Sequence, residues 1–392
     1  MATSTSWHVL QCSSAAILTT LVTGIASSVR AADVQYVTPR SGIPNVMARL
    51  RAGEPTTIAY LGGSITAGAD AWPTLVTQAL KQEFPDTPIE MVNIAIGATG
   101  STLAAFRMDR EVLPKNPDLI FLEFAVNDWH SVPDCIDSYE GILRKVWTAR
   151  PRCDIVFVHT TNQEWIDDLR NQRDVVTVRH HEAVAGYYGI PSINIGRKFI
   201  ASIDAGERTW DDVMGDTVHP HLKGHEVYAQ IVNAGLAALA GIGVPFDHDL
   251  GKPLYSGAWS TATMVPPAAA ETTGQWADQP VPWEAHFFDG VRISDTAGST
   301  LRFKFTGPVI GIFIGNGPGA GDIRWRVDGG DWTDIPAFVP DWWKDLHPFW
   351  WILRSKLDVQ AEHVLEIEIM GDPDTGKAGF LKLGAFLCVP TE

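Results

Sequence analysis

Short apolar segments alternate with helical patterns over residues 57–240, and this alternation constrains the fold most. Apolar runs suited to buried strands occur at 57–61, 89–94, 119–124, 155–160 and 192–195. Helical patterns lie near 71–83, 102–110, 138–148, 174–188 and 224–240. Strands that are apolar throughout and separated by helices form a parallel sheet that helices cover on both faces. The sequence therefore predicts a three-layer α/β/α domain.

The chain changes character after Pro245. Residues 250–285 are rich in Pro, Ala, Thr and Gly, which is typical of a long ordered connection or linker. Strand patterns return at 301–305, 309–314, 323–327, 364–369 and 381–387, with a hairpin signal at Asp328-Gly329-Gly330. We expect a domain over 32–245, a connection over 246–285 and a β-sandwich of jelly-roll type over 286–392.

The first 31 residues resemble a secretory signal peptide. They contain no Asp, Glu or Lys, include an apolar run at 15–26 and end in Val29-Arg30-Ala31, a small-residue pattern at a cleavage point. A disordered leader is the alternative, because no Lys or Arg precedes the apolar run. No later segment is apolar for long enough to span a bilayer. We expect a secreted or periplasmic protein with no membrane span.

Charge and cysteine usage exclude several classes of function. The 46 acidic residues outnumber the 30 basic ones, which argues against a nucleic-acid or anionic-membrane partner. Cys12 lies in the leader. Cys135 and Cys153 flank a helical pattern about 15 Å long, too far apart for a disulfide. Cys388 lies in a closing strand, so neither a disulfide framework nor a cysteine-based metal site is expected.

Four short segments carry the residues of one active site. They are Gly62-Gly63-Ser64-Ile65-Thr66, the run NIAIGATGS from Asn93 to Ser101, FAVND from Phe124 to Asp128, and Asp216-Thr217-Val218-His219. Ser64, Gly97 and Asn127 each follow a predicted strand, and reactive groups collect at the carboxyl ends of parallel strands. We therefore expect three loops to converge on one edge of the sheet.

The residue types fit a serine hydrolase. Ser64 can be a nucleophile, His219 its base and Asp216 the group that orients the base. Asn127 and backbone amides can hold an oxyanion. Simpler interpretations exist for each segment alone: an ordinary glycine or phosphate-binding turn, a helix cap beside a surface histidine, and a common Asn-Asp turn. The serine turn lacks the lysine that a phosphate-binding loop contains. None of these alternatives explains all four segments.

The order and spacing of these segments resemble the SGNH hydrolase superfamily, the GDSL-type esterases and lipases, over roughly residues 54–241. That family has a serine in a GDS or GGS turn, a glycine block, a GxND block and a DxxH block. The resemblance implies a flavodoxin-like sheet, a triad of Ser64, Asp216 and His219, and no cofactor or metal. It also implies an oxyanion hole, which would be formed by Ser64, Gly97, Ala98 and Asn127.

Two positions depart from the family pattern. Ala98 stands where the family often has its donor glycine, and Ala125 replaces the glycine of GxND. A backbone N–H survives a change to alanine, so the oxyanion role is retained. Which amide of Gly97 and Ala98 points inward stays open.

Several polar residues near these segments have structural interpretations. We expect Asp128 to anchor its loop and Arg107 to form a buried ion pair. The pair His180-His181 lies in a helical pattern and is expected on a solvated helix face rather than in a metal site.

Nine of the 15 tryptophans follow residue 250. The pairs Trp342-Trp343 and Trp350-Trp351 lie in a stretch without strand alternation, where indoles can stack on sugar rings or can pack in a core or domain interface. Superfamily members that act on acetylated glycans often carry an accessory domain. Trp342 and Trp343 are therefore candidate substrate contacts.

The sequence as a whole predicts a secreted serine esterase that removes acetyl groups from a poly- or oligosaccharide through an acyl-enzyme. One alternative is a lipase or thioesterase with an apolar acyl channel. Another is a non-catalytic glycan-binding protein on a hydrolase scaffold, which the intact Ser, Asn, Asp and His set disfavours. The sequence does not specify the glycan, the acyl group or the oligomeric state.

Overall fold

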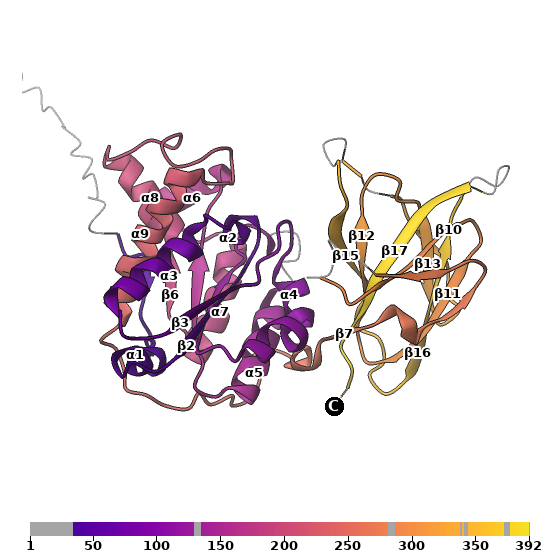
Figure 1. Ribbon diagram of the computed structural model, residues 1–392, viewed down its shortest axis with the longest axis horizontal. Coiled ribbons are helices and arrows are strands. Elements are labelled where there is room, and N and C mark those ends of the chain that lie inside the picture. The colour runs from indigo at the N-terminus through magenta and orange to yellow at the C-terminus, as the bar shows by residue number, and fades with distance from the viewer. Residues whose placement is uncertain are drawn as a thin grey trace, which may run out of the picture.

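A computed structural model describes residues 34–128, 135–280, 287–337, 339–340, 344–371 and 377–391. The expected signal peptide over 1–31 and the pair Trp342-Trp343 lie outside the described residues. Figure 1 shows two lobes side by side, a helix-rich lobe in indigo to magenta and a β-rich lobe in orange to yellow. The described part of the chain has no helix long and apolar enough to cross a membrane.

The first lobe contains a six-stranded sheet with the order β1-β6-β5-β4-β2-β3. Its strands are β1 (Val37–Thr38), β2 (Thr56–Gly62), β3 (Ile89–Asn93), β4 (Leu119–Glu123), β5 (Asp154–His159) and β6 (Ser192–Asn194). All neighbouring pairs are parallel except β1 with β6. The strand order from β3 to β6 is that of flavodoxin-like sheets. The predicted parallel sheet is confirmed, and β1 is an antiparallel edge strand that the sequence pattern did not indicate.

Helices cover both faces of this sheet. They are α1 (Pro44–Arg51), α2 (Ser64–Ala67), α3 (Trp72–Glu83), α4 (Ser101–Arg107), α5 (Cys135–Ala149), α6 (Ile166–Arg170), α7 (Val176–Tyr188), α8 (Ile195–Asp204) and α9 (Leu222–Leu239). The chain also has one π-helix, η2 (Met108–Val112), and the 3₁₀ helices η3 (Leu113–Lys115), η5 (Gln163–Trp165), η6 (Ala258–Thr261) and η7 (Pro267–Ala269) among the described residues. Successive strand residues enter opposite cores: Leu61 packs with α4 and α5, whereas Tyr60 packs with α3 and α9. Burial on both faces explains why the strands are apolar throughout.

The second lobe consists of two antiparallel sheets. One has the order β15-β12-β17-β10-β9 with β7 beside β17, and the other has the order β14-β13-β16-β11-β8. The strands are β7 (Thr263–Val265), β8 (Glu271–Thr273), β9 (Ala277–Gln279), β10 (Val291–Thr296), β11 (Thr300–Thr306), β12 (Ile310–Asn316), β13 (Ile323–Val327), β14 (Thr333–Ile335), β15 (His347–Arg354), β16 (Glu362–Ile369) and β17 (Lys377–Cys388). Phe303 of one sheet stacks on Phe386 of the other, with 3.9 Å between the ring centroids. The predicted antiparallel β-domain is confirmed.

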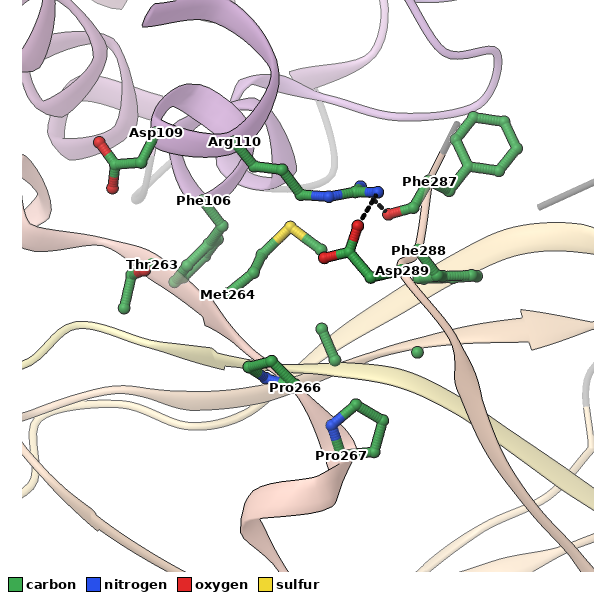
Figure 2. A pocket seen from close by; sticks show the side chains of 12 residues that line it. Phe106, Asp109, Arg110, Thr263, Met264, Pro266, Pro267, Phe287, Phe288 and Asp289 are labelled. Atoms are coloured by element: carbon green, nitrogen blue, oxygen red, sulfur yellow. Dashed lines mark hydrogen bonds and ion pairs between the residues drawn. The ribbon is translucent and has the colours of Figure 1, made fainter. Parts of the chain in front are cut away.

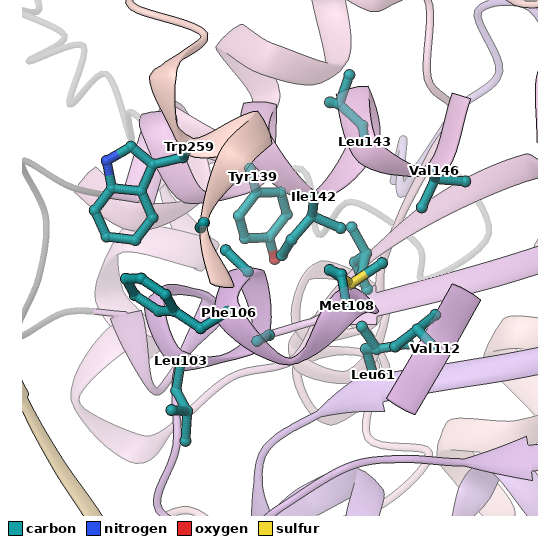
Figure 3. Close-up of a cluster of buried hydrophobic side chains, with 14 of the residues drawn as sticks. Leu61, Leu103, Phe106, Met108, Val112, Tyr139, Ile142, Leu143, Val146 and Trp259 are labelled. Carbon is teal, nitrogen blue, oxygen red and sulfur yellow. The ribbon is translucent and has the colours of Figure 1, made fainter. Parts of the chain in front are cut away.

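The segment expected as a connection over 246–285 is built into both lobes where it is described. It supplies β7, β8 and β9 to the sandwich. Trp259 packs into the helix layer, and its ring centroid lies 5.2 Å from that of Phe106 (Figure 3). Gly141 of α5 allows this approach, because a Cβ there would lie 2.6 Å from Trp259 Cβ. We propose a domain boundary near Pro245. The segment that follows this boundary packs against both lobes.

An apolar cluster joins the two lobes. It includes Phe106 and Ile142 from the helices together with Phe288 and Phe313 from the sandwich. Polar contacts surround it: the Arg110 guanidinium donates to the Phe287 carbonyl and pairs with Asp289 at 3.0 Å (Figure 2). The sandwich therefore rests on the helices that follow the glycine loop of residues 97–100.

Trp350 and Trp351 do not lie in an irregular segment, so that prediction is wrong. Both belong to β15, where they pair with Phe313 and Ile312 of β12. Trp350 packs against the apolar cluster between the lobes, and Trp351 packs against the core of the sandwich. Consecutive side chains on opposite faces are both half-buried here, which removed the alternation that marks a strand.

A contact between His363 and Asp328, in the turn after β13, should make the stability of the protein depend on pH. His363 Nδ1 contacts Asp328 Oδ2 at 2.7 Å, and the ring also contacts the Asp358 carbonyl. Burial acts to lower the pKa of His363, but these two oxygens outweigh it and the pKa lies above its usual value. The stabilisation is therefore complete below the unfolded pKa of about 6.5 and is lost as the pH rises through the folded pKa.

We expect His363→Gln to lower the free energy of unfolding by about 0.5–1 kcal/mol in mildly acidic buffer. The difference from the wild type should shrink toward alkaline pH, because the wild-type imidazolium then loses its proton. Urea unfolding of both proteins across this pH range measures it. A difference that stays constant with pH would contradict the assignment.

Candidate active site

Three strand ends bring Ser64, Gly97 and Asn127 together at the carboxyl edge of the sheet. Ser64 begins α2 directly after β2, with Gly63 in extended backbone between them. Gly97 lies beside the serine, since a Cβ on Gly97 would be 3.6 Å from Ser64 Cβ. A Cβ on Gly63 would overlap Asn127 Oδ1. Glycine at position 63 therefore lets the Asn127 side chain approach the serine turn.

Ser64, His219 and Asp216 form a continuous chain of hydrogen bonds. Ser64 Oγ lies 2.8 Å from His219 Nε2, and His219 Nδ1 lies 2.9 Å from Asp216 Oδ2. The side chains of His219 and Asp216 are 48% and 55% exposed. A substrate can therefore reach these groups from solvent.

The protonation state of this chain follows from its donors and acceptors. Asp216 Oδ1 accepts from the amides of Val218 and His219 at 2.6 Å each. Partial burial acts to raise the pKa of Asp216, but these amides and the His219 ring outweigh it and the pKa lies below its usual value. A carboxylate can only accept, so the imidazole carries its proton on Nδ1 and leaves Nε2 to accept from Ser64. This arrangement can activate a serine hydroxyl.

Neighbouring loops hold the Asp216–His219 loop in place. The Gln163 amide donates to the Thr217 carbonyl at 2.8 Å, and Trp210 Nε1 donates to the Asp216 carbonyl at 3.2 Å. Gly215 donates to the His219 carbonyl at 2.8 Å. The loop is thus fixed from the β5 side as well as from its own turn.

The glycine loop departs from ordinary backbone at Ala98. Its φ is +59°, in the left-handed region that costs a non-glycine residue about 1–2 kcal/mol. Ala98 is exposed, whereas Gly97 lies against Ser64. Across the site, Asn127 Oδ1 is buried and has no hydrogen-bond partner among the described residues.

A buried carboxyl group, Glu123, lies beneath the serine turn and was not identified from the sequence. Thr66 Oγ1 and Thr160 Oγ1 donate to it at 2.8 and 2.6 Å, and the Gly63 amide also contacts it. Burial raises the pKa of Glu123 to about 7, against the effect of these donors. The available signal was a carboxyl within the apolar run 119–124, because a buried acid needs donors.

The polar residues near the site fall into place with one correction. Asp128 anchors its loop through Ser101, and Arg107 is buried and pairs with Glu111 at 2.5 Å, both as expected. The solvated-face prediction is wrong for His181, which is fully buried against Asp128. The described residues contain no cluster of His, Cys, Asp and Glu suited to a metal ion. No disulfide joins the three described cysteines.

Residues 60–227 match the model of the GDSL-like Lipase/Acylhydrolase family. This range contains Ser64, Gly97, Asn127, Asp216 and His219. The resemblance to SGNH hydrolases is confirmed. No curated protein sequence gives a significant match.

The chain is similar in fold to two crystal structures of a two-domain esterase active on acetylated mannans. The one co-crystallized with mannopentaose has 20% identity and a TM-score of 0.77, covering 91% of this chain and 97% of that chain. The other has 21% identity and a TM-score of 0.75, covering 88% and 94%. Matches that cover 91% and 88% of this chain include both lobes, so the likeness extends to the two-domain architecture.

Proposed function

We propose that this protein is a serine esterase that removes acetyl groups from a poly- or oligosaccharide. The observation that carries the proposal is the solvent-accessible hydrogen-bond chain from Ser64 through His219 to Asp216, with Asn127 and Gly97 beside the serine. The GDSL-like match and the fold shared with an esterase active on acetylated mannans support it.

Acylation begins with attack of Ser64 Oγ on the acetyl carbonyl carbon. The hydroxyl proton passes to His219 Nε2, and Asp216 stabilises the imidazolium that forms. The oxyanion accepts hydrogen bonds from the Ser64 and Gly97 amides and from Asn127 Nδ2. We choose Gly97 over Ala98 because Gly97 lies against the serine.

The tetrahedral intermediate then collapses. The bond between the acetyl carbon and the sugar oxygen breaks, and His219 returns its proton to that oxygen, so the sugar alcohol leaves. Water next attacks the acetyl-enzyme while His219 takes one of its protons. Acetate departs as Ser64 regains its proton, and ping-pong kinetics follow.

The second domain would position a polymeric substrate. We propose that Trp342 and Trp343 contact sugar rings, as expected from the sequence. Binding energy from such remote contacts can orient an ester at the serine. We also propose that residues 1–31 direct secretion and are removed.

Substrate profiling tests this function. Nitrophenyl esters of increasing acyl length come first, followed by acetate release from acetylated mannan and xylan. We expect acetyl esters to be preferred and acetate to be released from glycan, with chelators having no effect. Preference for long acyl chains would indicate a lipase, and binding to glycan without hydrolysis would indicate a non-catalytic protein.

Asn127→Ala tests the oxyanion site. The Asn127 amide would stabilise charge that exists only in the transition state, so kcat should fall about 10²- to 10³-fold with little change in KM. Asn171→Ala, which changes the exposed asparagine at the C-terminal end of α6, is the matched control and should retain full activity. An effect confined to KM would instead assign Asn127 to substrate positioning.

A further inference from the structure

We propose that Asp128 and His181 form a buried pair that fixes the spacing of the two oxyanion loops, so that both are positioning residues for ester hydrolysis. The proposal rests on the proposed function and adds a role for two residues that do not touch the substrate. One loop carries Asn127 after β4, and the other is the glycine loop of residues 97–100 after β3.

The Asp128 carboxylate connects the two loops directly. Its Oδ1 accepts from the Ser101 amide at 2.8 Å, and its Oδ2 accepts from Ser101 Oγ at 2.7 Å. Ser101 follows the glycine loop and begins α4, while Asp128 follows Asn127 in the chain. One carboxylate therefore sets the distance between the side chain of Asn127 and the amide of Gly97.

Glycines make this close approach feasible. A Cβ on Gly100 would lie 2.5 Å from Asp128 Oδ1, just as a Cβ on Gly63 would overlap Asn127. The neighbouring residues Asn127 and Asp128 thus each lie against a glycine of a different loop. The serine turn, the glycine loop and the β4 loop meet at this dipeptide.

His181 contacts the Asp128 carboxylate from a third element of the fold. It comes from α7, and its Nε2 lies 3.0 Å from Asp128 Oδ2, with both residues fully buried. The His181 ring stacks on the Tyr139 ring with 3.8 Å between the centroids, and this contact fixes the plane of the imidazole. Burial lowers the pKa of His181 against the effect of Asp128, which favours the neutral ring. A neutral ring facing a carboxylate carries its proton on Nε2 and donates it.

The functional consequence concerns transition-state geometry. An oxyanion hole works through donors placed where charge develops, and a displacement of about 1 Å can cost on the order of 10² in rate. Loss of the carboxylate would free the two loops to separate while leaving Ser64, His219 and Asp216 in contact. The effect should therefore appear in kcat rather than in KM.

The experiment compares Asp128→Ala, His181→Phe, His181→Gln and the control His180→Gln on nitrophenyl acetate. We expect Asp128→Ala to lower kcat by about 10² with KM changed less than about threefold. His181→Phe keeps the stacking but removes the donor, so it should lose about tenfold. His181→Gln retains a donor and should recover part of that loss. His180→Gln, which alters the adjacent half-buried residue, should match the wild type.

A double-mutant cycle with Asn127→Ala separates this role from a purely structural one. If Asp128 acts by placing Asn127 and Gly97, the double variant should be far less impaired than the product of the two single effects. Fully multiplicative effects, or folded Asp128→Ala protein with wild-type kcat, would overturn the inference. If Asp128→Ala does not fold, the comparison of His181→Phe with His181→Gln decides. An inactive wild type would instead reject the proposed function itself.

Discussion

Ser64→Ala and His219→Ala should each reduce turnover on nitrophenyl acetate by on the order of 10⁶, because nucleophile and base act as a unit. Each substitution breaks the 2.8 Å contact between Ser64 Oγ and His219 Nε2. His219 is about half exposed, so its removal should not disturb the core. Steady-state kinetics on the purified variants measure the effect.

His221→Asn is the matched control for His219→Ala. His221 lies two residues away, but its Nδ1 accepts from the Gly224 amide and caps α9 instead of facing Ser64. An asparagine can cap in the same way, so activity should be retained. Losses of tenfold or less in folded Ser64→Ala protein would reject this residue as the nucleophile.

Asp216→Asn should lower kcat by on the order of 10⁴, the effect known for serine hydrolases with this change. The amides of Val218 and His219 both donate to Oδ1, so the carbonyl oxygen of the asparagine would occupy that place. Its Nδ2 would then face His219 Nδ1 and donate to it. The ring would carry its proton on Nε2 and could not accept the proton of Ser64.

Asp212→Asn is the control for this change, because Asp212 is exposed in the same region and accepts from the Thr209 amide instead of the ring. We expect nearly full activity in Asp212→Asn and intact secondary structure in both variants. A loss below about tenfold in Asp216→Asn would indicate that the carboxylate does not set the tautomer of His219.

The parallel sheet could be predicted because its residues report burial locally. Tyr60 and Leu61 enter opposite cores, so the strand is apolar throughout and the helices beside it show their own period. The site segments could be located for a related reason. Each follows a strand, and the carboxyl ends of parallel strands share one edge.

Other elements depend on contacts that no local pattern contains. The strand β1 has two residues and exists through its pairing with β6. The strands β7, β8 and β9 lie in a segment rich in Pro, Ala and Thr. They form because β8 and β9 add to sheet edges and β7 pairs with the end of β17. Composition alone therefore indicated a connection there.

The buried polar groups were the hardest to assign. His181 looks like a residue of a polar helix face, and its burial becomes understandable only with Asp128, which comes from a distant loop. Glu123 likewise depends on Thr66 of α2 and on Thr160, which follows β5. A buried polar side chain is stable where donors surround it, and those donors are supplied by the tertiary structure.

Active-site labelling tests the central claim most directly. A fluorophosphonate reacts with an activated serine and forms a stable adduct, which peptide mass spectrometry can locate. We expect one label per chain on the peptide that contains Ser64, loss of esterase activity in proportion to labelling, and no labelling of His219→Ala. Complete inactivation with the label on another residue, or an active enzyme that retains its activity with Ser64 fully labelled, would contradict the assignment of Ser64 as the nucleophile.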